Sequence, residues 1–358
     1  MDDIGVGIIG AGGIAALSHL PEIAKVDGLR VVNIAGRKER RLKLLADRHG
    51  IPRYVTSWDD LLSDDAVQAV IVGLPHPLHA EAGLKALRAG KHLFMQKPLC
   101  ATMDEADALV AECEARPDQA VYCRPSFSAT VQKMRELVAA GAIGKVSGAA
   151  ARHSHGGPEV YYAEVADSFE EPRRKDDLWF FDASQASVGA LFDMGVYAVA
   201  QLVAVLGRAV SVTARLTTVD KPTGLEDTAT LIIEFENGAL ATAETGWCDP
   251  ARTSLIRVHG TAGKLWHPGT DGHGLDHLRP GSADRENAPP IKAHPEVAAV
   301  PNQHVEWLAH IRAGGQPALS NIWCARHVIE ILLGAIRSNA DGTRVALHTR
   351  PAQQVRRS

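Results

Sequence analysis

The chain has 358 residues, enough for two domains of ordinary size that each bury a core. It is 46% hydrophobic and 22% charged with a formal net charge of −4, a balance that gives no electrostatic reason to expect nucleic acid or an anionic membrane as a partner. No apolar stretch approaches the roughly 20 residues that cross a bilayer, and the five cysteines are scattered without a CxxC pair, so we expect a cytoplasmic protein with reduced thiols.

The first 123 residues alternate predicted strands with predicted helices. Helical spacing of alanine and leucine over residues 78–90 and a capping-box spacing at residues 102–105 predict two of the helices. Apolar runs typical of parallel strands fall at residues 4–9, 29–35, 53–55, 67–73, 92–95 and 120–123. We therefore expect a Rossmann domain, a doubly wound α/β parallel sheet, over residues 1–123.

The pattern changes in the remainder of the chain, where longer strands follow one another through turns. The alternating segment 228–247 surrounds Asn237-Gly238 and predicts a hairpin with a type I′ turn. A second, α+β domain on an antiparallel sheet is therefore expected over residues 124–358.

Helices are also predicted in this second part, at residues 189–207, 302–313 and 323–337. Those nearest the C-terminus are candidates to pack back on the first domain. The segment 267–300 is rich in Pro, Gly, His and Asp and has no period, which predicts a long surface excursion.

A glycine-rich turn opens the first predicted helix. Residues 10–15 read G-x-G-x-x-A directly after a strand. The first glycine permits the tight turn, the second lets the backbone approach a pyrophosphate, and the small third residue allows close helix–sheet packing. This context predicts a dinucleotide site at Gly10, Gly12, Gly13, Ile14 and Ala15, and the alternative is a glycine-rich turn without a ligand.

The end of the second predicted strand distinguishes between two nicotinamide cofactors. An NAD-preferring site has an acidic residue there, but this chain has Gly36, followed by Arg37, Lys38, Arg40 and Arg41. Cations near a helix N-terminus oppose the helix dipole and need an anion or open solvent. A 2′-phosphate would be that anion. We therefore expect NADP(H) to be preferred over NAD(H) and held by Gly36, Arg37, Lys38 and Arg41, the alternative being a solvated basic turn.

Two more segments end at the carboxyl edge of the predicted parallel sheet, where doubly wound folds bind ligands. Lys97 ends the fifth strand and is fixed against Pro98. We expect it to point into the nicotinamide cleft, although a solvated loop lysine is the alternative. Further cofactor contacts are expected from the residues that follow the fourth and fifth strands, namely Leu74, Pro75, His76, His79, Gln96 and Lys97.

A polar stripe marks the predicted helix 189–207. Asp193, Tyr197 and Gln201 are spaced i, i+4 and i+8 and share one side of an otherwise apolar helix. Because burying Asp and Tyr without partners is costly, the stripe should face a polar cleft. A structural Asp–Tyr pair is the alternative.

The wall of a substrate site has several candidate residues. Trp179 could stack on a sugar face or fill core, and His153 and His155 share one face of a predicted strand. Two such histidines can bind zinc, but no third ligand is near in the sequence, so we expect no metal. The predicted substrate contacts are Lys97, Arg124, His153, His155, Trp179, Asp193 and Tyr197.

These motifs together resemble the Gfo/Idh/MocA oxidoreductases, a family named for glucose–fructose oxidoreductase and inositol dehydrogenase. The resemblance is carried by "GIIGAGGIA", "LPHPLHAEAGLKALRAGKHLFMQKPL", "GAIGKVSG", "WFFDASQASVGALFDMGVY" and "AIRSNADGTRVAL". It implies a Rossmann domain and an open C-terminal antiparallel sheet that forms a homodimer or homotetramer. It also implies that Lys97 is the catalytic lysine, that Asp193 belongs to a conserved helix motif, and that a sugar, cyclitol or related small polyol is oxidised or reduced.

Three positions depart from the family pattern. Gln96 replaces a glutamate, Tyr197 replaces the motif histidine, and Gln201 replaces an acidic residue. In having tyrosine at this position, the chain resembles the branch of glucose–fructose oxidoreductase, xylose dehydrogenase and dihydrodiol dehydrogenase. That branch favours NADP. We expect Lys97 and Tyr197 to handle the proton, because a neighbouring ammonium favours the phenolate, and Asp193 to orient the amine. The alternatives are a redox-neutral sugar-modifying enzyme and a non-catalytic NADPH-sensing regulatory protein.

Overall fold

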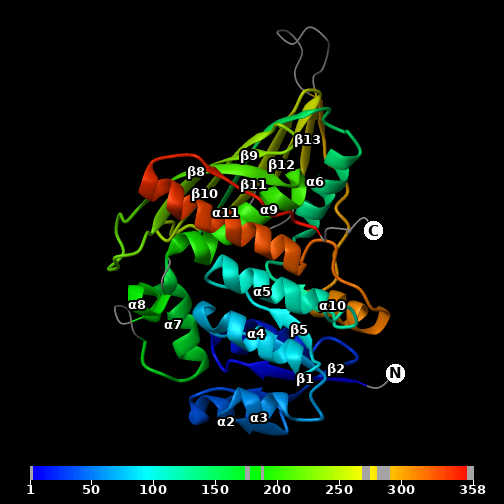
Figure 1. The fold of residues 1–358 in the computed structure, drawn as a ribbon, viewed down its shortest axis with the longest axis vertical. Helices are drawn as coiled ribbons and strands as arrows, with labels where there is room; N and C mark the ends of the chain where they lie inside the picture. The colour runs from blue at the N-terminus through cyan, green and yellow to red at the C-terminus, as the bar shows by residue number, and fades with distance from the viewer. Residues whose placement is uncertain (1–2, 174–177, 187–188, 268–274, 280–290, 353–358) are drawn as a thin grey trace. The chain divides into compact units, whose positions relative to one another are not determined.

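The computed structural model describes residues 3–173, 178–186, 189–267, 275–279 and 291–352 (Figure 1). The chain divides into two compact units. The first combines residues 1–126, 158–187 and 301–329, and the second combines residues 127–157, 188–300 and 330–358. The sequence predicted a boundary at residue 123, with C-terminal helices as candidates to pack back on the first domain. Two later segments belong to the first unit, and their apolar side chains, such as Val165 and Trp307, lie in its core.

The first unit is built on a parallel sheet with the strand order β3-β2-β1-β4-β5-β6. This order confirms the predicted doubly wound fold, and the point where it reverses, between β1 and β4, is where such sheets bind dinucleotides. The strands lie where the apolar runs predicted them, at Ile4–Ile9 (β1), Leu29–Ala35 (β2), Arg53–Val55 (β3), Ala69–Val72 (β4), His92–Met95 (β5) and Val121–Cys123 (β6).

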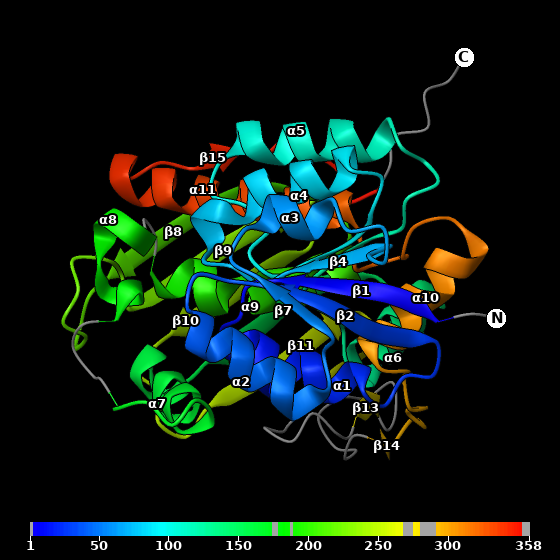
Figure 2. The ribbon, with the colours of Figure 1, turned by 90° about the horizontal axis from the view of Figure 1, so that it is seen from below.

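Helices lie on both faces of this sheet. Figure 2 shows α3, α4 and α5 on one face and α1 and α2 on the other. The predicted capping box is present at α5, where the Thr102 and Glu105 side chains cap each other's backbone N–H groups. The helical segments of this unit are Ala15–His19 (η1), Leu20–Ile23 (α1), Glu39–His49 (α2), Trp58–Leu62 (α3), His76–Leu78 (η2), His79–Arg88 (α4), Met103–Glu114 (α5), Pro158–Ser168 (α7), Trp179–Phe181 (η3), Ala183–Ala186 (α8) and Gln303–Ala313 (α10).

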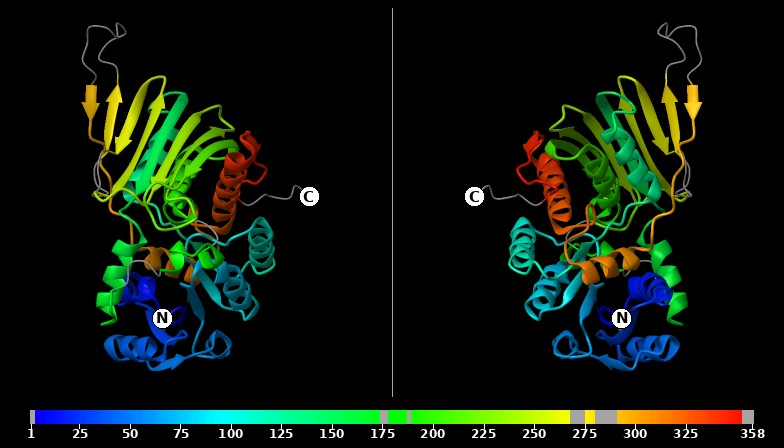
Figure 3. Two further views of the ribbon diagram at one scale, coloured as in Figure 1. Left: turned by 90° about the vertical axis from the view of Figure 1, so that its left-hand side faces the viewer. Right: turned by 90° about the vertical axis from the view of Figure 1, so that its right-hand side faces the viewer.

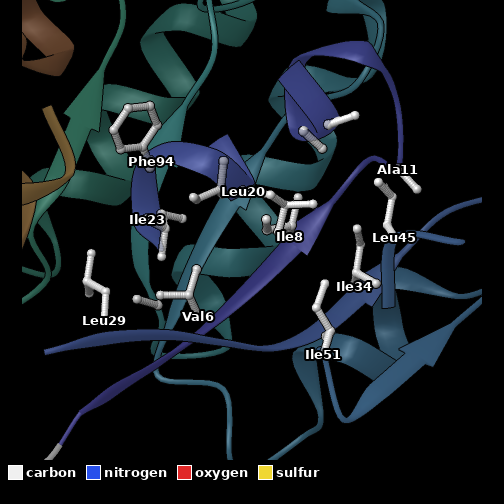
Figure 4. Close-up of a cluster of buried hydrophobic side chains, with 14 of the residues drawn as sticks. Val6, Ile8, Ala11, Leu20, Ile23, Leu29, Ile34, Leu45, Ile51 and Phe94 are labelled. Carbon is white, nitrogen blue, oxygen red and sulfur yellow. The ribbon is translucent and has the colours of Figure 1, made fainter. Parts of the chain in front are cut away.

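A buried hydrophobic core of the first unit lies between the sheet and the helices α1 and α2 on one of its faces (Figure 4). Phe94, in β5, stacks on Tyr122 with ring centroids 4.7 Å apart. Figure 4 labels Val6, Ile8, Ala11, Leu20, Ile23, Leu29, Ile34, Leu45, Ile51 and Phe94, which are all buried. This packing fixes the two segments that begin at the ends of β1 and β2, where the cofactor residues are predicted.

The second unit contains a mixed, mainly antiparallel sheet with the order β14-β13-β12-β11-β7-β10-β9-β8-β15, in which β7 and β10 pair in parallel. The expected surface excursion over 267–300 is wrong for residues 276–279 and 291–293, which add β13 and β14 to the sheet, whereas residues 294–300 are irregular as expected. The strands span Val146–Ser154 (β7), Ala209–Thr217 (β8), Thr228–Phe235 (β9), Leu240–Gly246 (β10), Thr253–Gly260 (β11), Gly263–His267 (β12), Asp276–Arg279 (β13), Ile291–Ala293 (β14) and Val345–Ala346 (β15).

Helices lie on one face of this sheet, as Figure 3 shows. They are Ala129–Ala139 (α6), a π-helical turn Leu191–Gly195 (η4) that continues into Val196–Leu206 (α9), and the C-terminal part of Ile322–Asp341 (α11). On the opposite face the side chains of Ile232, Leu240 and Trp266 are exposed. Among the described residues, no helix has both the length and the hydrophobicity needed to span a bilayer.

The hairpin between β9 and β10 forms where it was predicted, but its turn is not type I′. A type I′ turn needs positive φ at both central residues, and Asn237 is not among the positive-φ residues. Instead, the Gly238 N–H donates to the carbonyl of Phe235, and Gly238 itself adopts φ +84°. This is the geometry of a three-residue loop that ends in a left-handed glycine.

Candidate active site

The glycine turn after β1 has the geometry of a pyrophosphate site. Gly10 adopts φ +117°, and a Cβ at this position would lie 2.4 Å from the carbonyl oxygen of Gly73. A Cβ built on Gly12 would meet no atom of the described residues within 4 Å, so the backbone there is open to a ligand. Ala15 is fully buried, as close helix–sheet packing requires. The cradle fits a dinucleotide, and a side chain at Gly10 would destroy it.

The basic turn after β2 has an internal anion that the sequence did not reveal. Gly36 packs against the glycine turn, since a Cβ on it would lie 2.9 Å from that of Ala11. Arg37 and Lys38 are exposed. The guanidinium of Arg41 instead forms two hydrogen bonds with the carboxylate of Glu171. Arg41 is therefore already paired. Arg37, Lys38 and Arg40 are exposed, and the last two each have a nitrogen 3.8 Å from the same carboxylate.

The segment after β4 is connected to the segment after β5 through His79. One ring nitrogen of His79 lies 2.7 Å from the carbonyl of Pro98 and the other 2.8 Å from that of Leu74. Both nitrogens are thus used within the protein, which fixes His79 between the two loops, and the expected cofactor contact of His79 stays a prediction. Its neighbour His76 contacts the ring of Trp179, with centroids 5.8 Å apart.

Lys97 has a distinctive environment at the end of β5. In the described stretch 93–100 it is the only residue that is not buried. The strand and the loop after it therefore hold one charged amine at the carboxyl edge of the sheet, as the sequence predicted.

A buried chain of hydrogen bonds holds the residue that precedes this lysine. The Gln96 amide lies 2.7 Å from Nε2 of His19, and Nδ1 of His19 lies 2.8 Å from Nε2 of His304. Nδ1 of His304 lies 2.9 Å from the side-chain oxygen of Asn302. The distances suit imidazole rings that each donate one hydrogen bond and accept another along this network. Gln96 is thus tied to the helix after the glycine turn, a partnership that local sequence could not show.

The histidine in the middle of this hydrogen-bond network, His19, is uncharged at neutral pH. Burial lowers the pKa of His19 well below the ordinary value for histidine. At the outer end, Nδ1 of His304 also lies 3.3 Å from Oε2 of Glu22. Burial opposes ionisation of Glu22, but hydrogen bonds from His304 and Gln303 outweigh it and lower the pKa of Glu22 to about 2. The negative charge therefore lies at the outer end of the network, and His19 and Gln96 are neutral.

We expect the free energy of unfolding to fall as the pH is lowered from 7 to 5, in part because of His19. Its folded pKa lies below that of the unfolded chain, so the unfolded state takes the proton first and gains up to about 1.4 kcal/mol per pH unit below 6.5. Urea unfolding at pH 7, 6 and 5 should show a weaker pH dependence for His19→Gln. The exposed His348→Gln serves as the control, and equal slopes for both variants would contradict the assignment.

The polar stripe is present on η4 and α9. Between Leu191 and Leu206 every residue is buried except Asp193, Tyr197 and Gln201. The ring of Tyr197 stacks on that of His153, with centroids 4.5 Å apart and an interplanar angle of 27°. The structure therefore places two predicted site residues, one from β7 and one from α9, in direct contact.

Asp193 has two ring partners in the second unit. The indole N–H of Trp247 donates to Oδ2 of Asp193 at 2.9 Å, and Nε2 of His155 lies 3.6 Å from the same oxygen. The backbone N–H of Gly157 donates to Nδ1 of His155 at 2.8 Å, so the ring proton belongs on Nε2, facing the aspartate. Trp247 was not predicted, since one tryptophan after a strand carries no motif.

The N-terminal end of this helical segment is anchored by Glu226, which the sequence also did not single out. Its carboxylate accepts hydrogen bonds from the backbone N–H groups of Gly189 and Leu191, both at 3.0 Å. Burial raises the pKa of Glu226. A Cβ at Gly189 would lie 2.0 Å from the Glu226 carbonyl oxygen, so glycine is needed for this close approach.

The remaining predicted contacts lie in the first unit. Trp179 donates from its indole N–H to the hydroxyl of Tyr162 and is partly exposed, and Arg124 is also partly exposed. Within the described part of the chain, no cluster of three or more His, Cys, Asp or Glu side chains could hold a metal ion.

The sequence matches two family models. Residues 4–122 match the oxidoreductase family with an NAD-binding Rossmann fold, and residues 131–266 match the GFO/IDH/MocA C-terminal domain. The first match contains the glycine turn and Lys97, and the second contains Asp193 and Tyr197.

Known proteins resemble the chain over most of its length. A D-xylose 1-dehydrogenase (NADP(+)) 2 of Haloferax volcanii is 31% identical over 262 residues, 72% of this chain and 74% of the relative. A trans-1,2-dihydrobenzene-1,2-diol dehydrogenase of Oryctolagus cuniculus is 30% identical over 240 residues, 66% of this chain and 65% of the relative. Among solved structures, an oxidoreductase domain protein from Kribbella flavida has a TM-score of 0.80 at 25% identity and covers 97% of this chain and 100% of its own.

Proposed function

The chain belongs to the GFO/IDH/MocA family of NAD(P)-binding oxidoreductases, and from this premise we propose that it transfers hydride between NADP(H) and a hydroxyl or carbonyl of a sugar, cyclitol or related small polyol. The observation that carries the proposal is Lys97, a single partly exposed amine at the carboxyl edge of a sheet whose first turn is a dinucleotide cradle. The names of the xylose and dihydrodiol dehydrogenase relatives support the substrate class.

The cofactor would be held by the two turns at the switch point of the sheet. The segment Gly10–Ala15 would bind the pyrophosphate, and Gly36, Arg37 and Lys38 would bind the adenosine ribose and its phosphate. When bound, the nicotinamide supplies or accepts the hydride. NADP(H) is favoured because no acidic residue follows β2 directly and because the xylose dehydrogenase relative is named for NADP; NAD(H) is the second choice.

The proton would be handled by Tyr197 and Lys97. In the direction of oxidation, Tyr197 accepts the proton of the substrate hydroxyl while the ammonium of Lys97 stabilises the developing alkoxide. Asp193, held by the Trp247 indole, would balance and orient that ammonium. The substrate itself would be held by residues around these groups, namely Arg124, His153, His155 and Trp179.

A titration followed by a turnover assay tests this proposal. Purified protein is titrated with NADPH and NADH by nicotinamide fluorescence and then given a panel of polyols and keto-sugars, with turnover read at the nicotinamide absorbance. NADPH binding with turnover is the expected result. Tight binding without any absorbance change would favour a redox-neutral sugar-modifying enzyme or an NADPH-sensing regulatory protein, and preference for NADH would overturn the cofactor assignment.

We also propose that the exposed face of the second unit's sheet pairs with another copy of the chain to form a homodimer or homotetramer. Ile232, Leu240 and Trp266 are exposed there, and large apolar side chains exposed on one face are typical of interfaces. Ile232→Arg should lower the molar mass measured by light scattering to that of a monomer, whereas Val219→Arg, in an exposed loop, should not. A wild-type monomer would contradict the proposal. The cytoplasmic location stays a prediction.

A further inference from the structure

The segment that follows β7 returns to the first unit and lies along its dinucleotide turn. A Cβ built on Gly13 would lie 2.3 Å from Cγ2 of Val165 and 2.5 Å from the hydroxyl of Tyr161, both in α7. Val165 and Phe169 belong to the buried core of this unit. Figure 2 shows α7 next to α2, the helix that begins after the basic turn. The segment is therefore fixed in place beside both turns of the cofactor site.

Glu171, three residues beyond the end of α7, lies close to three cations of the basic turn. Nε of Arg41 donates to Oε1 of Glu171 at 2.7 Å, and Nη2 of Arg41 donates to Oε2. Nη1 of Arg40 and Nζ of Lys38 each lie 3.8 Å from the same carboxylate. The guanidinium of Arg41 also lies 4.3 Å from the ring centroid of Phe169. The hydrogen bonds from Arg41 lower the pKa of Glu171, so it is an anion at neutral pH.

These cations are the ones that a 2′-phosphate would need. In a dinucleotide fold the 2′ position lies at the end of the second strand, where an arginine accommodates the phosphate. Here Gly36 follows that strand and lies against Ala11 of the glycine turn, and the basic residues follow directly. A carboxylate on Arg41 therefore occupies part of the positive charge that would otherwise act on the phosphate.

We propose that Glu171 is a cofactor-selectivity residue, an internal carboxylate that competes with the 2′-phosphate of NADP(H) for Arg41 and so limits the preference over NAD(H). The inference rests on the proposed function, and it names the residue that weakens the preference of the protein for NADP(H) over NAD(H). Arg37 then becomes the main phosphate ligand, because it has no ion-pair partner among the residues that the structure describes.

The test compares Glu171→Gln with Glu170→Gln. Glutamine removes the charge but keeps the shape, and Glu170 is an exposed neighbour whose interaction with Arg40 is through its backbone carbonyl. Fluorescence titrations with NADPH and NADH at low salt are the readout. For Glu171→Gln we expect the Kd for NADPH to fall roughly 5- to 20-fold, because one like charge near a dianion is removed, while the Kd for NADH changes less than about twofold. Glu170→Gln should match wild type, and the gain should shrink at high salt.

An unchanged or weaker affinity of Glu171→Gln for NADPH would overturn the proposal. If that variant does not fold, the pair Arg41→Met and Glu171→Met, made together, removes both charges and keeps the net charge. Its affinity for NADPH should stay within about threefold of wild type, because a self-neutralised pair is replaced by apolar side chains. A loss of tenfold or more would show that Arg41 itself binds the phosphate and would also overturn the proposal.

The wild-type titration separates this inference from the proposed function. Wild-type protein that prefers NADH would contradict the proposed cofactor. The ratio of the Kd for NADPH of Glu171→Gln to that of wild type would still show whether Glu171 weakens NADPH binding. Wild-type protein that binds neither dinucleotide would overturn both.

Discussion

Replacing Lys97 by methionine is expected to lower kcat by about 10²- to 10⁴-fold, the usual effect of removing a proton-transfer or charge-stabilising group. Methionine keeps most of the length of the side chain but removes the ammonium. Because Lys97 alone is partly exposed in a buried stretch, the change should leave the fold intact. The Kd for NADPH, from fluorescence titration, should change far less than kcat, from steady-state assays.

Two further variants refine this test. Lys145→Met removes an exposed lysine at the start of β7 and should keep full activity. Lys97→Arg keeps the positive charge but cannot give up a proton near neutral pH. Substantial activity in Lys97→Arg would limit the role of Lys97 to charge stabilisation, and more than about a tenth of wild-type activity in Lys97→Met would remove it from the mechanism.

The parts of the site that could be predicted are those built from neighbours in the sequence. The glycine turn, the capping box at Thr102 and the stripe on α9 each depend on spacings of three to eight residues, and each is present in the structure. A parallel sheet also brings the ends of its strands to one edge, which is why the sequence alone places Lys97 at that edge.

The parts that could not be predicted depend on partners far away in the chain. Glu171 lies 130 residues from Arg41, and His304 lies 285 residues from His19. No local pattern marks either pair. Strands β13 and β14 were missed for another reason, because runs of four and three residues are too short to show a period.

Gln96 shows how a distant partner changes the interpretation of a motif. A glutamine before Lys-Pro could indicate a site that has lost its chemistry. In the structure its amide is bonded to neutral His19, whose pKa burial lowers. A glutamate at this position would need a proton on the histidine or would leave a charge in the core. The glutamine is thus matched to a neutral network, and it carries no argument against catalysis by Lys97.

Replacing Tyr197 by phenylalanine is expected to lower kcat by about 10²- to 10⁴-fold, because the proposed proton acceptor is removed. Phenylalanine keeps the ring that stacks on His153 at 4.5 Å, so the loss should come without a change in stability. Thermal unfolding and steady-state kinetics measure the two effects separately. Tyr54→Phe, which removes a phenol from an exposed position in β3, should leave both unchanged.

The substitution Tyr197→His separates proton transfer from packing. Histidine is the residue that the family motif has at this position, and it can accept a proton near neutral pH. If Tyr197 acts as an acid–base group, the histidine variant should be clearly more active than the phenylalanine variant, and its kcat should follow a different pH profile. If Tyr197 only supports His153 and Asp193, phenylalanine should be nearly as active as tyrosine. In that case Lys97 would have to transfer the proton without the phenol of Tyr197. The pH profile of kcat in Tyr197→Phe would then be the same as in wild type.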